Sequence, residues 1–432
     1  MYRQILVDPE DRSLQKILWR HDDQITPRTY ELNTVTYGLA CAPFLAVHSL
    51  RQLADDEEAR FPHGSAVLRR DVYVDDILTG APTIEEAMDL QRQLTKLCTA
   101  GGFPLRKWSA NDPVCWRALR QSTGLSATCC PGRRRRATPL LASTGTRTGT
   151  VFSFSTRFLT VAAYTKRSVL SLTARLFDPL GWLAPTVIRA KVMFQSTWLR
   201  GATWDTPLEE ANAQQWSTFE RDFPRLEEIR VERRVPVCDA YAKVELHGFA
   251  DASERAYAAV VYSRTEDHQG GISISLIAAK TRVAPLKTVS LPRLELCAAS
   301  LLTKLVAHLR QVLGAEDVPI HLWSDSTVAL GWIRGHPSRW TVYVANRVAE
   351  IQTALPGACW HHLPGKENPA DCASRGISPS ELVHHLLWWK GPLWLSEDRT
   401  SWPSSREEQP TGNMPEKTRQ RARGCCATTR DD

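Results

Sequence analysis

The pattern of apolar and polar positions between residues 240 and 380 switches repeatedly between the period of a strand and the period of a helix. Apolar residues recur at helical spacing from Pro292, whose fixed φ suits a first helical turn, as far as Leu309. Strands are predicted over 244–251, 256–262, 272–278, 320–324 and 360–363, and further helices over 327–334, over 341–355 and from Asp371 to a stop at Gly376. Strands alternating with helices predict a mixed sheet flanked by helices, which is an α/β fold.

The first half of the chain contains a shorter pattern of a different kind. Residues 71–78, Asp-Val-Tyr-Val-Asp-Asp-Ile-Leu, place two adjacent carboxylates in an apolar, β-branched setting. This pattern predicts a hairpin whose turn carries Asp75 and Asp76. Paired carboxylates in such a setting repel one another unless a cation lies between them. The alternative interpretation is an acidic surface turn.

Two stretches lack any such pattern. Residues 126–150 run from Cys-Cys-Pro-Gly through four arginines, 133–136, into a Thr/Gly/Ser-rich stretch, and residues 404–432 are equally unpatterned. This composition cannot bury enough apolar surface to offset the entropy of ordering, so we expect a linker and a disordered tail. The arginine run either binds phosphates, acts as a nuclear signal or records a reading-frame lesion.

Composition limits the class of protein. A chain of 432 residues predicts about two or three domains, and 43% hydrophobic residues suffice for packed cores. The formal charge of +7 and a pI near 8.9 suit a protein that binds nucleic-acid backbones. Eleven cysteines without a spacing framework argue against a secreted disulfide scaffold. No apolar run reaches the length of a membrane span and the N-terminus is no signal peptide, so we expect an intracellular protein, in the cytoplasm or nucleus, that does not enter a membrane.

Four carboxylates of the second half occupy separate local contexts. Asp251 closes a predicted strand, Asp325 follows another, and Glu295 and Asp371 lie near the starts of predicted helices. Two strand ends and two helix starts can converge on one point. Oxygen ligands converging there suit Mg²⁺, which keeps waters and accepts substrate phosphate oxygens. Two such ions about 3.5 to 4 Å apart can hold the attacking water and the leaving oxygen of a phosphodiester. The pattern therefore predicts a nuclease site.

These carboxylates and their neighbours resemble the Asp-Glu-Asp-Asp set of the ribonuclease H family, in its retrotransposon branch. The resemblance rests on Phe-Ala-Asp-Ala-Ser at 249–253, Leu-Pro-Arg-Leu-Glu-Leu at 291–296, Trp-Ser-Asp-Ser at 323–326 and Asn-Pro-Ala-Asp-Cys-Ala-Ser-Arg-Gly at 368–376. It implies that Asp251, Glu295, Asp325 and Asp371 bind two Mg²⁺ or Mn²⁺ ions and that the enzyme cleaves RNA in RNA/DNA hybrids. Contacts to 2′-hydroxyls would select RNA, with Ser253, Ser326 and Asn368 as candidates. His361 or His362 either assists product release or packs at the strand end.

Segments of the first half resemble a reverse transcriptase. These are Thr-Tyr-Gly-Leu-Ala-Cys-Ala-Pro-Phe at 36–44, the hairpin at 71–78 and Gly-Gly-Phe-Pro-Leu-Arg-Lys-Trp-Ser at 101–109. The resemblance implies that Asp75 and Asp76 are metal ligands of a polymerase palm, that Tyr2 screens sugars, and that Tyr37 and Gly38 line the nucleotide pocket. A third aspartate of the family would precede Met1 and is absent. We therefore expect no polymerisation by this chain alone.

The segment between these halves resembles the connecting region of BEL/Pao retrotransposon Pol polyproteins. The motifs are Thr-Lys-Arg-Ser-Val-Leu-Ser at 165–171, Ala-Arg-Leu-Phe-Asp-Pro-Leu-Gly-Trp-Leu-Ala-Pro at 174–185 and the Trp-rich run at 387–395. The resemblance implies an α/β and α+β multidomain chain that works on nucleic acid beside other Pol segments such as integrase. The expected divisions are a truncated polymerase palm (1–125), a basic linker (126–150), a mostly helical connecting region (151–235), a ribonuclease H-like domain (236–378), a Trp-rich segment leading toward an integrase (379–403) and a disordered tail (404–432).

Three other functions fit part of the sequence. The chain is alternatively an inactive nucleic-acid-binding relic that keeps the acids without activity. The connecting region is grouped with a Pao-type aspartic peptidase, but Asp178 precedes Pro179 and lacks the hydroxyl residue that such an active loop needs. The set Cys359, His361, His362 and Cys372 contains zinc-ligand types without a standard zinc spacing.

Overall fold

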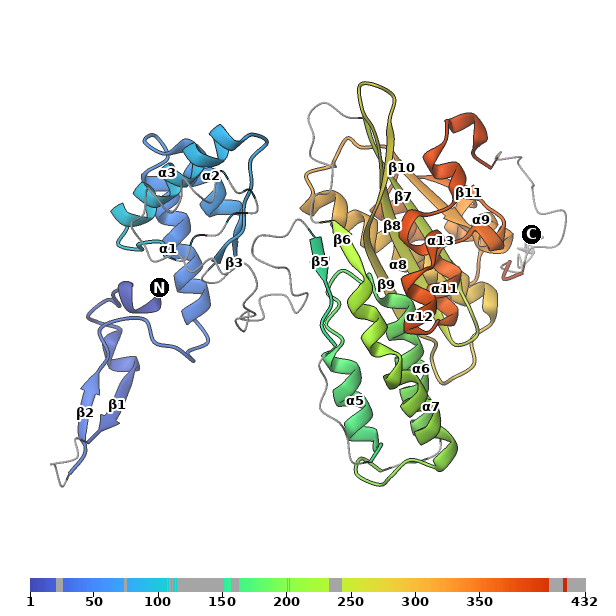
Figure 1. Cartoon of the computed structure of the whole chain (residues 1–432), viewed down its shortest axis with the longest axis horizontal. Coiled ribbons are helices and arrows are strands. Elements are labelled where there is room, and N and C mark those ends of the chain that lie inside the picture. Colours follow the sequence, from blue (N-terminus) through green and yellow to red (C-terminus); the bar gives the residue numbers. More distant parts are fainter. Residues whose placement is uncertain are drawn as a thin grey trace, which may run out of the picture. The chain divides into compact units, whose positions relative to one another are not determined.

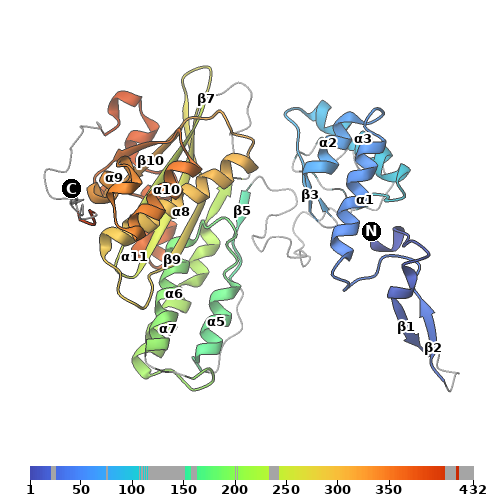
Figure 2. The ribbon, with the colours of Figure 1, turned by 180° about the vertical axis from the view of Figure 1, so that it is seen from behind.

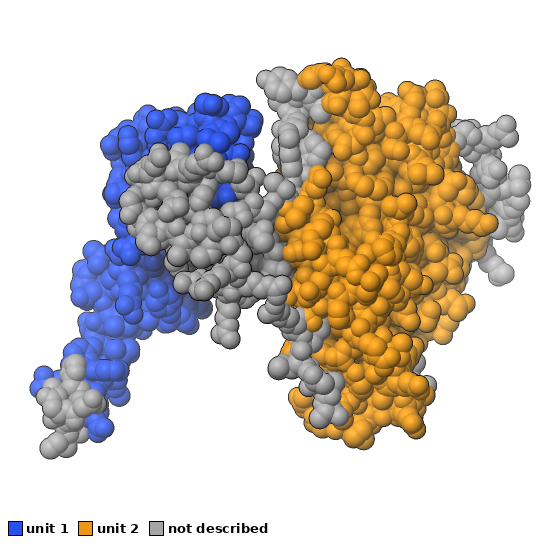
Figure 3. Space-filling view, viewed as in Figure 1, with its two compact units in different colours: residues 1–135, 147–149 blue, residues 136–146, 150–432 orange. Residues whose placement is uncertain are grey.

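The computed structural model comprises two compact units, which Figure 3 colours separately. One unit contains residues 1–135 with 147–149, and the other contains residues 136–146 with 150–432. The structure describes residues 1–20, 26–73, 76–106, 151–156, 163–199, 203–232, 243–403 and 415–417, and the single positions 108, 110, 112, 114 and 201. The predicted linker, 126–150, lies outside the described residues.

The described part of the first unit contains a β-ribbon, α-helices, short 3-10 helices and a small hairpin (Figure 1). Its elements are the 3-10 helices η1 (Tyr2–Gln4) and η2 (Arg12–Leu14), the antiparallel pair β1 (Lys16–Trp19) and β2 (Arg28–Glu31), the helices α1 (Ala42–Asp56), α2 (Pro62–Arg70) and α3 (Ile84–Ala100), and the antiparallel pair β3 (Val72–Tyr73) and β4 (Asp76–Ile77). The predicted hairpin at 71–78 is therefore present.

The helices of the first unit enclose a small apolar core. In α3, Thr83 caps the first turn by accepting a hydrogen bond from the Glu86 amide at 3.2 Å. Leu94, Leu97 and Cys98 follow at helical spacing and are buried against α1 and α2. The core therefore forms on one face of each helix.

The second unit is organised around a five-stranded sheet in the order β11-β10-β7-β8-β9. The strands are β7 (Lys243–Ala252), β8 (Ala256–Glu266), β9 (Ile272–Val283), β10 (Ile320–Ser324) and β11 (Cys359–His362). Strands β7, β8 and β9 form an antiparallel meander, whereas β10 pairs in parallel with β7 on one side and β11 on the other. The parallel register aligns Ala250 with Ser324, so β7 and β10 end at the same edge of the sheet.

One face of the sheet is covered by α8 (Leu291–Val312), with α9 (Thr327–Arg334) and α10 (Val342–Ala354) packed beside it (Figure 2). Leu294, Leu301 and Leu302 of α8 are buried against this face. Gly248 allows the close approach, since a Cβ there would lie 2.7 Å from a Leu302 methyl carbon. The helix is therefore fixed tightly on β7.

The opposite face is covered by the connecting region and the Trp-rich segment. The connecting region forms α5 (Lys166–Arg175), α6 (Ala184–Leu199), α7 (Glu210–Arg221), η3 (Phe223–Glu228) and the pair β5 (Val151–Ser153) and β6 (Arg230–Glu232). The later elements are η5 (Pro337–Arg339), η6 (Gly365–Glu367), α11 (Ala370–Arg375), α12 (Pro379–Val383), α13 (Leu386–Lys390), η7 (Leu393–Ser396) and η8 (Arg399–Ser401). A single apolar core joins Trp182 of the connecting region to Phe249 of β7 and Trp388 of α13.

Hydrogen bonds from tryptophan lock these segments together. The Trp388 indole N–H donates to the Trp182 carbonyl at 2.9 Å, and the Tyr262 hydroxyl donates to the Trp388 carbonyl at 2.6 Å. The Trp182 indole donates to the Ile277 carbonyl on β9 at 3.1 Å. The connecting region thereby covers the outer edge of the sheet, where unpaired backbone groups would otherwise be exposed.

The expected α/β and α+β multidomain class is confirmed. The predicted bounds of β10 and α9 coincide with those observed, and Gly376, at φ +81°, ends α11 as expected. The separation of residues 151–235, 236–378 and 379–403 into successive domains stays a prediction, since all three ranges fall in one compact unit. In the described part of the chain, no helix has the length and apolar character to span a membrane.

Replacing Gly181 by alanine is expected to weaken the contact between the connecting region and β9. Gly181 has φ +77°, and a Cβ there would lie 1.8 Å from the Ala279 carbonyl oxygen. We expect the free energy of unfolding to fall by more than ~1 kcal/mol, because an L side chain is strained at this φ and also collides with β9. Urea unfolding measures the change. Gly357→Ala is the control, since its Cβ meets open space; equal stability of the two variants would contradict the account.

Candidate nuclease site

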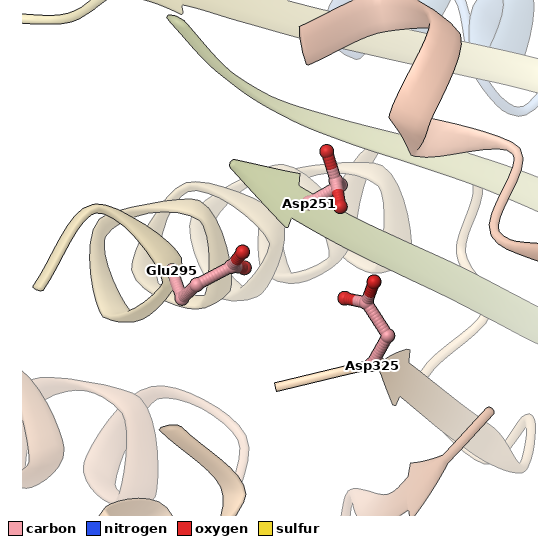
Figure 4. A group of neighbouring side chains, drawn as sticks. All are labelled: Asp251, Glu295 and Asp325. Carbon is pink, nitrogen blue, oxygen red and sulfur yellow. The ribbon is translucent and has the colours of Figure 1, made fainter. Parts of the chain in front are cut away.

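Three of the predicted carboxylates meet at the end of the parallel strands. Asp251 lies near the end of β7, Asp325 follows β10 directly, and Glu295 is the fifth residue of α8. Each offers a carboxylate oxygen, and these oxygens lie within 4.8 Å of one another. Figure 4 shows the three side chains pointing toward a common centre. The register of β7 and β10 and the packing of α8 therefore bring together residues that are 74 positions apart in sequence, from 251 to 325.

Two of the three carboxylates are buried, and the third, Asp325, is half-buried. Asp251 is 3% exposed and Glu295 is 8% exposed. Burial, with the neighbouring acids adding to it, raises the pKa of Asp251 to about 7 and that of Glu295 to about 9. Burial also raises the pKa of Asp325. The site therefore resists holding three negative charges in the absence of a cation.

The donor set fits a hard divalent cation. Glu295 Oε2 and Asp325 Oδ1 are buried and accept no hydrogen bond from the protein. A buried carboxylate oxygen without a partner is costly, and coordination to a cation would satisfy it. Carboxylate oxygens are the ligands that Mg²⁺ and Mn²⁺ prefer. Among the described residues this is the one group of three or more such side chains with this spacing.

The fourth predicted carboxylate, Asp371, lies outside this group of three. It is in α11, its side chain is 37% exposed, and its Oδ1 accepts a hydrogen bond from Arg375 Nε at 2.5 Å. Its negative charge still raises the pKa of Asp251, Glu295 and Asp325, which shows that it is electrostatically close. Metal coordination by Asp371 stays a prediction.

Sequence reasoning assigned no role to Ser374, which positions Asp251. The fully buried Ser374 hydroxyl donates to Asp251 Oδ2, and the Ser253 hydroxyl in turn donates to the Ser374 carbonyl at 2.9 Å. The available signal was the spacing of Ser374 three residues after Asp371, which places the two on neighbouring positions of a helix.

A second positioning feature is Gly365. A Cβ at this residue would lie 2.8 Å from Asp325 Oδ2, so the backbone of η6 passes close to this carboxylate. Only glycine leaves that space open, and a single glycine in a short turn gave no indication of such a role.

The three candidate contacts to RNA already have partners within the protein. Asn368 donates from Nδ2 to the Ala250 carbonyl at 2.9 Å, and Ser326 caps α9 by accepting from the Ala329 amide at 3.2 Å. Ser253 supports Ser374 as described above. These side chains therefore build the site, and their contact with 2′-hydroxyls stays a prediction.

The two candidate histidines of β11 have different surroundings. His361 is stacked on Trp323, with ring centroids 4.5 Å apart, and its Nε2 is 3.2 Å from His321 Nδ1. Burial lowers the pKa of His361 to about 4, which is consistent with packing inside the sheet. His362 follows on the opposite face of the strand, and its electrostatic interaction with Asp325 opposes a small part of the burial-driven rise in the pKa of that carboxyl. Of the two, His362 is therefore the one placed near the carboxylates.

The predicted polymerase residues are only partly described. The Tyr2 and Tyr37 rings meet edge to face with centroids 4.9 Å apart, and Gly38 has φ +89°. Asp76 begins β4, whereas Asp75 lies outside the described residues. Roles for these five residues in metal or nucleotide binding stay predictions.

The connecting-region aspartate has a structural partner instead of a second catalytic acid. Asp178 Oδ2 accepts a hydrogen bond from the Leu183 amide at 2.8 Å, just before α6. Burial raises the pKa of Asp178 to about 6, and a nearby Lys191 partly opposes this. We therefore assign Asp178 to the start of α6. Endopeptidase activity stays a prediction without a supporting observation, and the zinc-ligand types around His361 form no group in the described chain.

Part of the chain matches a known protein family. Residues 165–326 match the family model of the Pao retrotransposon-like RNaseH-like domain. The match includes Asp251, Glu295 and Asp325, and it confirms the resemblance to BEL/Pao retrotransposons. No curated protein matches the chain.

Several solved structures are similar. The foamy viral protease-reverse transcriptase in complex with RNA/DNA hybrid is 13% identical, with a TM-score of 0.47 over 84% of this chain and 43% of that one. RNase H1 from the halophilic archaeon Halobacterium salinarum is 15% identical, with a TM-score of 0.21 over 29% of this chain and 89% of that one. LC11-RNase H1, isolated from compost, is also 15% identical, with a TM-score of 0.21 over 30% and 91%. This chain thus spans less than half of the foamy viral protein.

The raised pKa values predict that the metal-free chain loses stability as pH rises. Asp251 and Glu295 go from ordinary values of 3.8 and 4.5 to about 7 and about 9 in the fold, so the folded state binds more protons than the unfolded state in that interval. The free energy of unfolding should therefore fall as the pH rises from 3.8 to about 9. Urea unfolding in EDTA across this pH range measures it.

The variants Asp251→Asn and Glu295→Gln should flatten that pH dependence, since neither replacement carries a negative charge. Asp317→Asn, at an exposed position beyond α8, should leave it unchanged. A wild-type slope retained in both site variants would show that the buried acids are not its source.

Proposed function

We propose that this chain, which carries a Pao retrotransposon-like RNase H-like domain, is a divalent-metal-dependent endonuclease that cleaves RNA in RNA/DNA hybrids. The observation that supports the proposal is the group formed by Asp251, Glu295 and Asp325, of which the first two are buried and the third is half-buried, with unpartnered buried oxygens on Glu295 and Asp325. Such a group is unfavourable as a structural feature alone. The group is suited to binding a divalent cation at a fixed position.

The proposed cofactor is two Mg²⁺ or Mn²⁺ ions, held by Asp251, Glu295 and Asp325 and by the more exposed Asp371. When bound, such ions polarise the scissile phosphate, lower the pKa of an attacking water and stabilise the departing 3′ oxygen. The protein's contribution is to place the ligands before substrate arrives. Ser374 fixes the Asp251 carboxylate, and the close backbone at Gly365 restricts Asp325.

Asp371 has a different role in this proposal. Its partner Arg375 is 68% exposed, and their ion pair lies at the protein surface. A surface ion pair is worth about 0–1 kcal/mol, so exchanging Arg375 for a cation has a low cost. Asp371 would therefore join the site when substrate and metal are present.

The proposed substrate is an RNA/DNA hybrid, and the proposed setting is a Pol polyprotein. The family match supports a retrotransposon origin, and the net charge of +7 favours a polyanionic partner. Reverse transcriptase ancestry of residues 1–125 and association with integrase rest on the sequence resemblance and are part of this proposal.

Cleavage of a labelled RNA/DNA hybrid by the full chain tests the function. We expect cleavage with Mg²⁺ or Mn²⁺ and none in EDTA. Asp251→Asn, Glu295→Gln and Asp325→Asn should each reduce the rate by about a thousandfold or more, since the lost metal stabilises transition-state charge by several kcal/mol. Asp317→Asn should retain the wild-type rate. Hybrid binding by a folded chain without cleavage would instead identify an inactive nucleic-acid-binding relic.

A further inference from the structure

A short C-terminal segment is bound at the junction of α8, α9 and α10. The Trp332 indole N–H donates to the Pro415 carbonyl at 3.0 Å, and the Thr341 amide donates to the Glu416 carbonyl at 2.8 Å. Lys417 forms an isolated bridge with Trp340. Residues 415–417 of the expected disordered tail thus have a defined place against the RNase H-like domain.

The Glu416 side chain occupies a site built for an anion. Arg293 binds Glu416 Oε1 through both Nε, at 2.8 Å, and Nη2, at 2.7 Å. The Thr341 hydroxyl donates to the second oxygen, Oε2, at 2.5 Å. The Glu416 carboxylate is 19% exposed, so these charge-assisted bonds are partly shielded from water.

The segment keeps this carboxylate in place at a conformational cost. Glu416, at φ 65°, is the one non-glycine residue of the described chain with a positive φ. That region is unfavourable for a residue with a Cβ, and glutamate is not among the types that tolerate it best. Apolar packing does not account for the position, because Glu416 is held through its carboxylate and its backbone. Arg293 and the Thr341 hydroxyl hold the carboxylate, while contacts with Trp332, Trp340 and the Thr341 amide hold the backbone of the segment.

Arg293 contacts Tyr343, an aromatic ring that it shares with a second arginine. It is two residues from Glu295 in α8, and its guanidinium carbon is 4.8 Å from the Tyr343 ring centroid. The Arg347 guanidinium carbon is 3.7 Å from the same ring. Arg347 also lines a groove of about 430 Å³ between α8 and α10, together with Arg282 and Lys304. In that groove the acid Glu350 is paired with Lys304 at 2.7 Å.

This arrangement suits a phosphodiester backbone. An arginine fork beside a hydroxyl donor binds two oxygens of a phosphate as it binds those of a carboxylate. Arg347 of α10, which shares the Tyr343 ring with Arg293, and Arg282 of β9 in the groove provide further positive charge for neighbouring phosphates. The Glu416 carboxylate therefore occupies the position that one phosphate of a nucleic acid would take.

We propose that Arg293 and Thr341 form a phosphodiester-binding subsite where the first turn of α8 meets the start of α10, and that Glu416 occupies it in the free chain as an internal competitor of nucleic acid. This proposal rests on the proposed function for the identity of the ligand, an RNA/DNA hybrid. Binding of the hybrid would displace residues 415–417. The free chain would accordingly bind hybrid more weakly than its basic surface allows.

Hybrid binding by the full chain in EDTA tests the proposal without requiring cleavage. Fluorescence anisotropy of a labelled RNA/DNA hybrid would be measured for Glu416→Gln, Arg293→Gln, the double variant and Glu228→Gln. Glu228 pairs with Arg225 on η3, so its variant removes one exposed negative charge at a different place. Thermal unfolding of every variant shows whether it is folded.

We expect Glu416→Gln to tighten binding about fivefold, because the fraction of chains with a free subsite rises. The slope of log affinity against log salt should steepen, since in the wild type salt also weakens the competing Arg293–Glu416 ion pair and so offsets part of its effect on binding. Arg293→Gln should weaken binding, and Glu416→Gln should have no effect in that background. Glu228→Gln should leave both quantities at their wild-type values.

The competing explanation is that Glu416 only stabilises the fold. In that case Glu416→Gln lowers the unfolding temperature and leaves affinity and salt slope unchanged, which would overturn the proposal. Equal tightening by Glu228→Gln would overturn it as well, since the effect would then be one of net charge. If Glu416→Gln does not fold, Glu416→Asp is the substitute, because it keeps the charge on a shorter side chain. Its affinity for the hybrid should then lie above that of the wild type and below the affinity expected for Glu416→Gln. An affinity equal to the wild-type value would contradict competition. If the binding changes are as expected but the wild-type chain does not cleave the hybrid, the nuclease function is refuted and the phosphodiester subsite is not.

Discussion

Mutual repulsion among Asp251, Glu295 and Asp325 is the constraint on which the rest of this structure depends. Burial first, and the like charges nearby second, raise the pKa values of these three groups, so their charged forms oppose folding unless protons or a cation neutralise them. The scaffold must therefore be rigid enough to hold them. Parallel pairing of β7 with β10 and the close packing of α8 over Gly248 supply this rigidity.

The connecting region contributes to the same rigidity from the other side of the sheet. Trp182 and Trp388 join α6 and α13 to the sheet through one apolar core, and their indole hydrogen bonds leave little freedom at the contact. The connecting region (151–235) and the Trp-rich segment (379–403) therefore help to hold the sheet that carries the nuclease carboxylates. The family match, which begins at residue 165 and ends at 326, likewise includes part of the connecting region with the sheet.

Local features of the fold could be predicted from sequence, and long-range ones could not. β10 and α9 were delimited correctly because an apolar run and Ser326 mark their ends. The ends of β8 and β9 were missed by several residues, since Ser263, Arg264 and Thr265 are polar yet buried by pairing and by contacts with distant segments. The Arg264 guanidinium, for example, donates to the Leu395 carbonyl at 3.1 Å, a contact that no local pattern reveals.

The candidate site shows the same division. Asp251, Glu295 and Asp325 could be identified from their motifs. The hydrogen bond from Ser374 to Asp251 and the ion pair between Arg293 and Glu416 depend on tertiary contacts and could not. The most direct test of the account is calorimetric titration of the full chain with Mn²⁺, compared with Asp251→Asn and Glu295→Gln. The account predicts saturable binding that releases protons in the wild type, because the raised pKa values leave the acids partly protonated, and binding that is lost or strongly weakened in both variants. Unchanged Mn²⁺ binding in the variants, or no saturable binding by the folded wild type, would contradict it.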